Sequence, residues 1–160
     1  MNSRQQKGIT TVEFAIIATM AMLVMLSVLE MGRLLFVLNT LGEATRRGAR
    51  VAAVCPINDP AVAQVAVFNT SGGGDSSPIL HNFSTSNIQL EYLDVAGTPI
   101  DATDPTNFTL IRFVRVGIAN FQHNMLIFAP FDASFALPAS ASTLPRESLG
   151  VPRTGPITPC

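Results

Sequence analysis

One acidic residue lies inside a long apolar stretch near the N-terminus. Residues 9–29 contain a single charged side chain, Glu13. As a helix this stretch covers about 30 Å, the thickness of the hydrocarbon core of a bilayer. A carboxylate there costs about 2.5–3.5 kcal/mol on insertion scales, so Glu13 is a candidate for an ionic interaction in an apolar environment. The alternative is a position near the interface, where Glu13 reaches the headgroups.

Other reactive side chains are few and scattered. His81 and His123 are isolated, which is typical of surface or partly buried polar residues, and Cys55 has no histidine nearby in sequence. Neither a Gly-x-Ser-x-Gly nor a His-Glu-x-x-His motif is present, and the glycines at 72–74 lack the Lys-Ser/Thr of a phosphate loop. We therefore expect no enzyme and no cofactor or metal site.

Composition limits the classes of partner. The 160 residues are 48% hydrophobic and 13% charged, with a net charge of −1, no tryptophan and one tyrosine. The net charge implies no bulk attraction to nucleic acid, and the lack of tryptophan with a single tyrosine leaves little material for base stacking. Its length allows one membrane helix and a domain of about 100 residues.

The residues before Glu13 form a pattern. Arg4 and Lys7 precede Gly8, and Glu13 is the fifth residue after that glycine. This arrangement resembles the processing site of type IV prepilins. The resemblance implies that a prepilin peptidase cleaves between Gly8 and Ile9, and that the freed amino group of one subunit meets Glu13 of its neighbour in a filament.

The apolar stretch does not fit a secretory signal peptide. It is longer than a hydrophobic region of 7–15 residues, and no small-residue cleavage site follows it. We therefore expect it to remain in the mature protein. The positive segment 1–7 favours a cytoplasmic N-terminus, but Arg46, Arg47 and Arg50 follow the stretch, so the orientation is inferred mainly from the processing pattern.

The helix is predicted to continue beyond the membrane. No proline occurs between Arg33 and Val54, and Pro56 is expected to end a helix of about 45 residues. Gly42 and Gly48 predict close approach of another element. One apolar-to-small face recurs at spacings of three and four, formed by Leu34, Leu38, Leu41, Thr45, Gly48 and Ala52.

Further elements narrow the resemblance. The runs at 12–15, 29–33 and 44–50, together with Asn39, resemble the TadE-like family of the tight-adherence (Flp) pilus systems. That family has Glu-aromatic-Gly-Arg and Ala-Arg-x-Gly-Ala-Arg-like elements. Met31 replaces the aromatic residue here, and the second element is varied. The resemblance covers about residues 8–54.

Four residues are candidates for a role in assembly: Glu13, its neighbour Phe14, Glu30 and Arg33. Glu30 and Arg33 lie three residues apart, on one helix face. They form either an interfacial ion pair worth at most about 1 kcal/mol or, as the resemblance implies, a contact that registers the subunit against other pilins or the assembly platform.

The two cysteines, Cys55 and Cys160, are far apart in sequence. If the C-terminal part is exported, a disulfide between them is favoured by the oxidising compartment. It would close a loop of about 100 residues, worth roughly 4–5 kcal/mol in the chain-entropy model. Free or intermolecular cysteines are the alternative.

The rest of the chain predicts an α+β fold, in which the long N-terminal helix packs on a small antiparallel β-sheet, as in pilins. Asp59 and Pro60 begin a short helix through Asn69. Strands are expected at 87–95, 108–119 and 132–142, the last either weakened or placed at an edge by Pro138. Residues 120–128 fit either strand or helix, and the residues after the last strand predict an extended tail.

These elements define the expected organisation. It comprises a leader (1–8), a transmembrane helix (9–30), its amphipathic continuation (31–55), a periplasmic α+β domain (56–145) and an extended tail (146–160).

Together the resemblances imply a minor pilin or pseudopilin-like subunit of a tight-adherence pilus system, processed after Gly8. Expected partners are other pilus subunits, the prepilin peptidase, the inner-membrane assembly platform and membrane lipid. The expected location is a single pass through a bacterial inner membrane with a periplasmic C-terminal domain, or the cell exterior once in a pilus. The alternatives are an unprocessed membrane-anchored periplasmic adaptor and a type II secretion pseudopilin.

Overall fold

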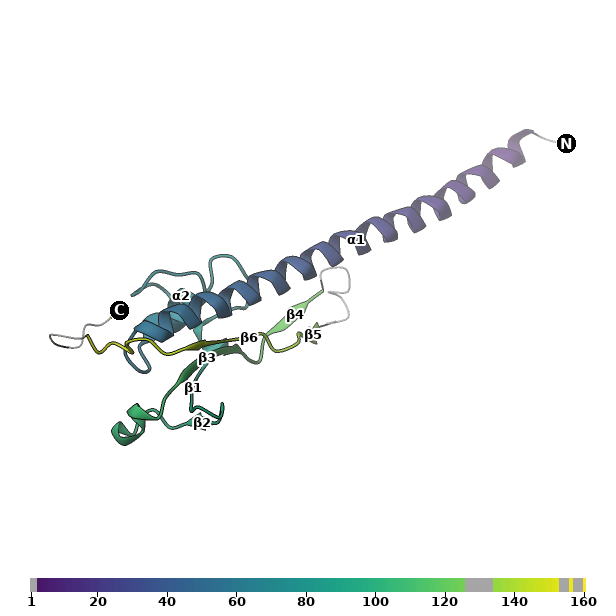
Figure 1. Ribbon diagram of the computed structural model, residues 1–160. Coiled ribbons are helices and arrows are strands. Elements are labelled where there is room, and N and C mark those ends of the chain that lie inside the picture. Colours follow the sequence, from purple (N-terminus) through teal and green to yellow (C-terminus); the bar gives the residue numbers. More distant parts are fainter. Residues whose placement is uncertain (1–2, 126–133, 153–155, 157–159) are drawn as a thin grey trace. The chain divides into compact units, whose positions relative to one another are not determined.

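The computed structural model describes residues 3–125, 134–152, 156 and 160. The chain divides into two units, Met1–Phe36 with Asn124–Ser134 and Val37–His123 with Phe135–Cys160. One helix, α1 (Ser3–Val54), runs through both (Figure 1). Its 52 residues exceed the predicted length of about 45, and it ends two residues before Pro56, as predicted.

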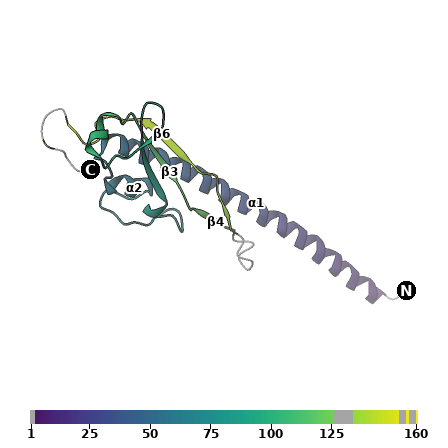
Figure 2. The same ribbon diagram turned by 90° about the horizontal axis from the view of Figure 1, so that it is seen from below.

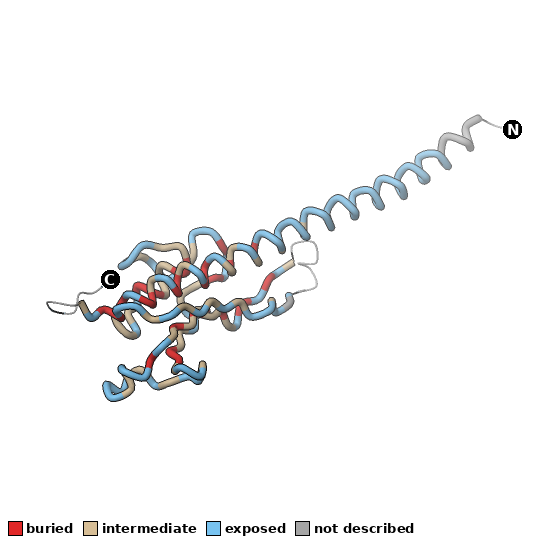
Figure 3. The backbone as a smooth tube through the Cα atoms, viewed as in Figure 1, coloured by how far each residue is buried: buried red, intermediate tan, exposed pale blue. Residues whose placement is uncertain are grey.

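The N-terminal part of α1 is bare. From Ile9 to Phe36 every side chain is exposed except those of Glu30 and Leu34, which are half-buried (Figure 3). Among the described residues this is the one helix that is long and apolar enough to cross a membrane.

The second unit has an α+β fold, as predicted, with the C-terminal part of α1 packed on a small antiparallel sheet (Figure 2). The sheet order is β2-β1-β3-β6. Its strands are β1 (Ile88–Leu93), β2 (Pro99–Ile100), β3 (Phe113–Ile118) and β6 (Ala141–Pro145). The remaining elements are the helix α2 (Pro60–Ala66), the 3-10 helices η1 (Thr85–Asn87) and η2 (Pro105–Thr109), and the two-stranded pair β4 (Gln122–Asn124) and β5 (Ser134–Ala136).

The core lies between α1 and the central strand β3. Side chains of β3 alternate, so that Val114, Val116 and Ile118 are buried while the residues between them are half-buried. On α1 the predicted face is buried from Leu41 onward, whereas Leu34 and Leu38 are only half-buried. Two clusters result. One joins the end of α1 to β3 and α2, and the other joins its middle to Phe83 and Phe121, whose rings meet edge to face.

Gly48 lets α1 approach the rest of the core closely. A Cβ atom there would lie 3.0 Å from both Ala66 Cβ and Val116 Cγ1. This agrees with the close approach expected at Gly48. The same expectation was wrong for Gly42, where a Cβ would meet nothing within 4 Å among the described residues.

We therefore expect Gly48→Val to destabilise the second unit by about 1–3 kcal/mol, because the branched side chain must displace both neighbours. Gly42→Ala is the matched control, and its effect should range from neutral to a gain of about 1 kcal/mol from helix propensity. Hydrogen exchange of the β3 amides measures the free energy of opening. Equal protection in Gly48→Val and wild type would contradict the packing.

The strand predicted at 108–119 begins only at Phe113. The Asp104 side chain accepts a hydrogen bond from the Thr106 amide (2.9 Å) and Pro105 occupies the first turn, so residues 105–109 form η2 instead. Phe108 is then half-buried against the core while Leu110 is exposed. The short helix α2 begins at Pro60 with Asp59 as N-cap, as predicted, but it ends at Ala66 and not at Asn69.

The strand predicted at 132–142 is divided. Residues 134–136 form β5, and β6 begins at Ala141, after Pro138. β6 is an edge strand, as expected. In the ambiguous region, 122–124 is strand β4, and residues 126–128 lie outside the described residues, as do 132 and 133 of the predicted last strand.

Candidate assembly and processing site

The predicted processing bond and the predicted acidic residue lie on one helix. Gly8 and Ile9 are within α1, and Glu13 follows Ile9 by four residues, which places these two on the same face. Ile9 is 62% exposed, Phe14 is 73% exposed and Glu13 is also exposed. In the part of the chain that the structure describes, Glu13 is in no ion pair.

The face next to Glu13 carries a shallow apolar groove that the sequence analysis did not identify. It is open to its surroundings and has a volume of about 520 Å³. Small side chains at every fourth position, Thr11, Ala15 and Thr19, leave space between larger ones, and this spacing is the signal that could have revealed it. The Thr19 hydroxyl donates to the Ala15 carbonyl (2.8 Å) and that of Ser27 to the Leu23 carbonyl (2.8 Å), so both are satisfied within the helix.

Glu30 and Arg33 form the ion pair that their spacing predicts. Arg33 Nη1 donates to both carboxylate oxygens of Glu30, at 2.8 and 3.0 Å. The side chain of Glu30 is only 12% exposed, whereas that of Arg33 is 46% exposed. This pair is therefore a local neutral unit on an otherwise apolar stretch of helix.

Residues 8–50 match the family model described as TadE-like protein. This segment, less than half of the chain, is similar to the TadE-like family. The match agrees with the resemblance to the family of tight-adherence (Flp) pilus assembly, which is a pilus-assembly family and not a known enzyme family. It lies wholly within α1, and residues 51–160 are outside it. Neither a curated protein nor a solved structure matches the chain.

The basic end of the TadE-like region has two faces. Gly48 and Ala49 are buried, while Arg46 and Arg50 are exposed. Arg46 lies 3.9 Å from Glu43, a weak exposed pair. The guanidinium carbon of Arg47 lies over the ring of Phe68, 4.9 Å from its centroid.

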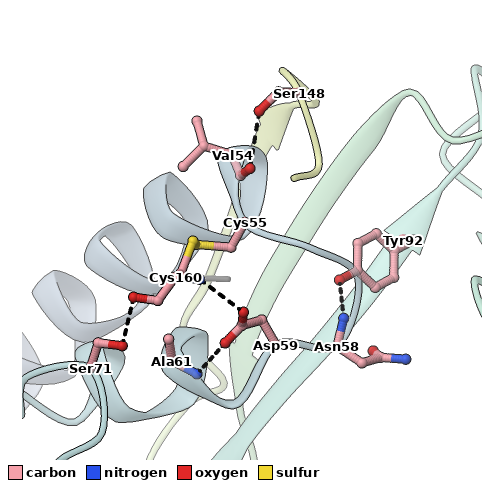
Figure 4. The surroundings of a disulfide bond; sticks show 9 residues. All are labelled: Val54, Cys55, Asn58, Asp59, Ala61, Ser71, Tyr92, Ser148 and Cys160. Atoms are coloured by element: carbon pink, nitrogen blue, oxygen red, sulfur yellow. Dashed lines mark hydrogen bonds between the residues drawn. A yellow bond between two sulfur atoms is a disulfide. The ribbon is translucent and has the colours of Figure 1, made fainter. Parts of the chain in front are cut away.

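Beyond the TadE-like match, a disulfide joins Cys55 and Cys160, with Cα atoms 5.8 Å apart (Figure 4). Cys55 is buried directly after α1, and Cys160 is exposed. The Cys160 amide donates to Asp59 Oδ2 (3.2 Å), whose Oδ1 caps α2, and the Ser71 hydroxyl donates to the Cys160 carbonyl (2.8 Å).

The residues before this bond close the end of α1. The Glu147 amide donates to the Ala53 carbonyl (3.0 Å), and the Gly150 amide to that of Val54 (2.6 Å). Leu149 is buried in the core. The expected tail is thus fixed near its start, where residues 147–150 satisfy carbonyls that the helix itself leaves open.

The remaining titratable residues form no obvious site. His81 is exposed, and His123 is buried rather than partly exposed as expected. The described residues contain no group of three potential metal ligands. Hydrogen bonds from the Thr103 and Thr106 hydroxyls and amides lower the pKa values of Asp101 and Asp104, respectively, and keep these exposed carboxylates ionised in their turns.

Tyr92 offers a test of the packing at this end of α1. Burial raises the pKa of its hydroxyl above the ordinary 10.0, although the hydrogen bond from the Asn58 amide opposes the shift and nearby Asp59 adds to it. The pKa of Tyr92 is therefore higher in the folded chain than in the unfolded chain, and the protonated hydroxyl adds to the free energy of unfolding. This contribution is complete below about pH 10 and is lost as the pH rises through the pKa of Tyr92 in the folded chain.

Ultraviolet titration should therefore give a tyrosinate midpoint above 10.0, and the assignment is unambiguous because the chain has one tyrosine. Tyr92→Phe should remove the signal and the alkaline loss of stability. A midpoint at or below the ordinary value would contradict the buried position.

Proposed function

We propose that this chain is a minor pilin or pseudopilin-like subunit of a tight-adherence pilus system, processed between Gly8 and Ile9. Before assembly it is held in the inner membrane by the apolar part of α1, and its second unit lies on the periplasmic side. The observation that carries the proposal is the TadE-like match, which begins at Gly8 and includes Glu13.

The exposed apolar surface of α1 supports this function. From Ile9 to Phe36 only Glu30 and Leu34 are partly covered by the described part of the chain. Bare apolar helix of this length is unfavourable in water. It suits a subunit whose helix moves from a lipid environment to the packed centre of a filament.

The position of Glu13 supports a role in joining subunits. Cleavage after Gly8 frees the amino group of Ile9, one turn before Glu13 on the same face. An ammonium group and a carboxylate in an apolar bundle are tolerated when they pair. Glu13 of one subunit can then receive the amino group of the next.

The disulfide is consistent with export of the second unit. Disulfides form and persist in oxidising compartments such as the periplasm, and are rare in the cytosol. Cys55 and Cys160 are paired, and the described residues include no free cysteine.

The direct test is the N-terminus of the protein purified from cells with the intact assembly system. Mass spectrometry of the N-terminal peptide should give a chain that begins at Ile9. Gly8→Leu should retain residues 1–8, because a bulky residue then precedes the cleavage bond, whereas Gly42→Ala on the same helix should be processed normally. A wild-type chain that retains Met1 or lacks only that residue contradicts processing and favours the unprocessed periplasmic adaptor.

A further inference from the structure

The exposed apolar surface of α1 is longer than a bilayer is thick. It begins at Ile9 and continues past the Glu30–Arg33 pair to Phe36, and the first buried residue is Val37. These roughly 28 residues extend about 42 Å, against about 30 Å of hydrocarbon. Covering the whole surface requires a tilt of about 45°, more than the usual range of transmembrane helices.

The bilayer must therefore select one part of this surface. If it covers residues 9–28, it includes the carboxylate of Glu13, and it leaves Met31, Leu35 and Phe36 in water, each more than half exposed. This arrangement places a charge in lipid and apolar side chains in water.

The alternative is that the bilayer covers residues 14–36. At a tilt of about 20° this segment spans about 32 Å, which matches the hydrocarbon core. Glu13 then lies at the N-terminal interface, on the same side as Arg4 and Lys7. The exposed side chains of Met31, Leu35 and Phe36 then enter the lipid.

With residues 14–36 in the bilayer, a placement that we call the register of the helix, two charged side chains lie in the lipid. These are Glu30 and Arg33, and they neutralise each other. Both carboxylate oxygens of Glu30 accept hydrogen bonds from Arg33, and the Glu30 side chain is largely shielded. Glu30 and Arg33 are about 9 and 5 Å from the C-terminal boundary at Phe36. The half-exposed Arg33 can extend toward the headgroups from there.

We propose that the bilayer covers residues 14–36 of the unassembled protein, with Glu30–Arg33 as a lipid-embedded ion pair and Glu13 at the interface. The proposal rests on the membrane-anchored pilin-like function proposed above. It has a consequence for processing, since the Gly8–Ile9 bond lies outside the hydrocarbon, about 8 Å before Phe14, where water and a peptidase can reach it.

Cysteine labelling tests this register. The full chain is reconstituted in vesicles of phosphatidylethanolamine and phosphatidylglycerol, with a charged maleimide on both sides. Cys55 and Cys160 are bonded to each other, so an introduced cysteine is the reactive one. Met31→Cys is the test, with Val24→Cys as the lipid control and Asn39→Cys as the water control, all three at exposed positions.

Labelling at Met31→Cys should be at least about tenfold slower than at Asn39→Cys, because the reagent needs a solvated thiolate. Denaturation of the protein in urea and SDS should abolish the difference. Labelling at Met31→Cys as fast as at Asn39→Cys overturns the register.

A second substitution tests the ion pair. Glu30→Gln leaves Arg33 without its carboxylate and should raise the labelling of Met31→Cys toward the water control. Glu43→Gln, an exposed glutamate later on the same helix, should leave it unchanged. An unchanged rate with Glu30→Gln overturns the role of the pair. The vesicles contain no peptidase, so these outcomes are independent of whether the chain is processed, which the N-terminal peptide reports separately.

Discussion

Glu13→Gln should be processed after Gly8 but should fail to enter pili. Glutamine keeps the size and the hydrogen-bonding groups of the side chain and removes its charge. In the proposed assembly, the amino group of Ile9 from the neighbouring subunit is then left unpaired in an apolar bundle. Breaking a buried ion pair in this way costs about 3–5 kcal/mol, which corresponds to on the order of a 100-fold or greater loss of incorporation.

Immunoblotting of sheared pili and of the membrane fraction measures the share of the protein that is incorporated into pili. Glu43→Gln is the matched control, because Glu43 is an exposed glutamate of α1 whose contact with Arg46 is weak; its incorporation should equal that of wild type. Normal incorporation of Glu13→Gln would show that the charge is not used in assembly.

Cys160→Ser should lower the free energy of unfolding of the second unit by about 4 kcal/mol in the chain-entropy model, because the bond closes a long loop. The separation of the two cysteines is 105 residues. Urea denaturation of the full chain in detergent micelles can be followed by the fluorescence of Tyr92, since the chain contains no tryptophan.

Two comparisons make this measurement specific. Reductant should destabilise wild type to the level of Cys160→Ser and leave the variant unchanged. Ser71→Ala, which removes the hydrogen bond to the Cys160 carbonyl but keeps the disulfide, should lose no more than about 1 kcal/mol. A wild-type transition that is insensitive to reductant would contradict a stabilising bond.

The helix and the general fold class could be predicted from local sequence. Absence of proline before Pro56 and small or apolar residues at helical spacing define α1 and the face that it buries. Gly48 indicated a close approach, and the structure supplies the partners, Ala66 and Val116. Gly42 has the same local signal, but among the described residues a Cβ there would meet nothing within 4 Å, which only the tertiary structure reveals.

The strand boundaries were less predictable because local capping competes with β propensity. Phe108 and Leu110 fit a strand pattern, but Asp104 and Pro105 favour a 3-10 turn. The docking of residues 147–150 depends on helix carbonyls some 94 residues earlier in the chain. No local pattern encodes such a contact, so this segment was predicted as an extended tail.

For the candidate site, sequence spacing was sufficient to predict the Glu30–Arg33 pair, because residues three apart on a helix are neighbours. It did not predict the extent of the bare surface, which depends on where the second unit begins to cover the helix. Burial that starts at Val37 is a tertiary property.

The Cys55–Cys160 bond has a mechanical consequence. A force applied between the N-terminal part of α1 and Cys160 is carried by the helix to Cys55 and from there through the disulfide to Cys160. The β-sheet, which lies between the two cysteines in sequence, does not carry this force. The 105-residue separation corresponds to about 350 Å of contour length at full extension. That length stays unavailable while the bond is intact, so stretching the chain between these points cannot unravel the sheet.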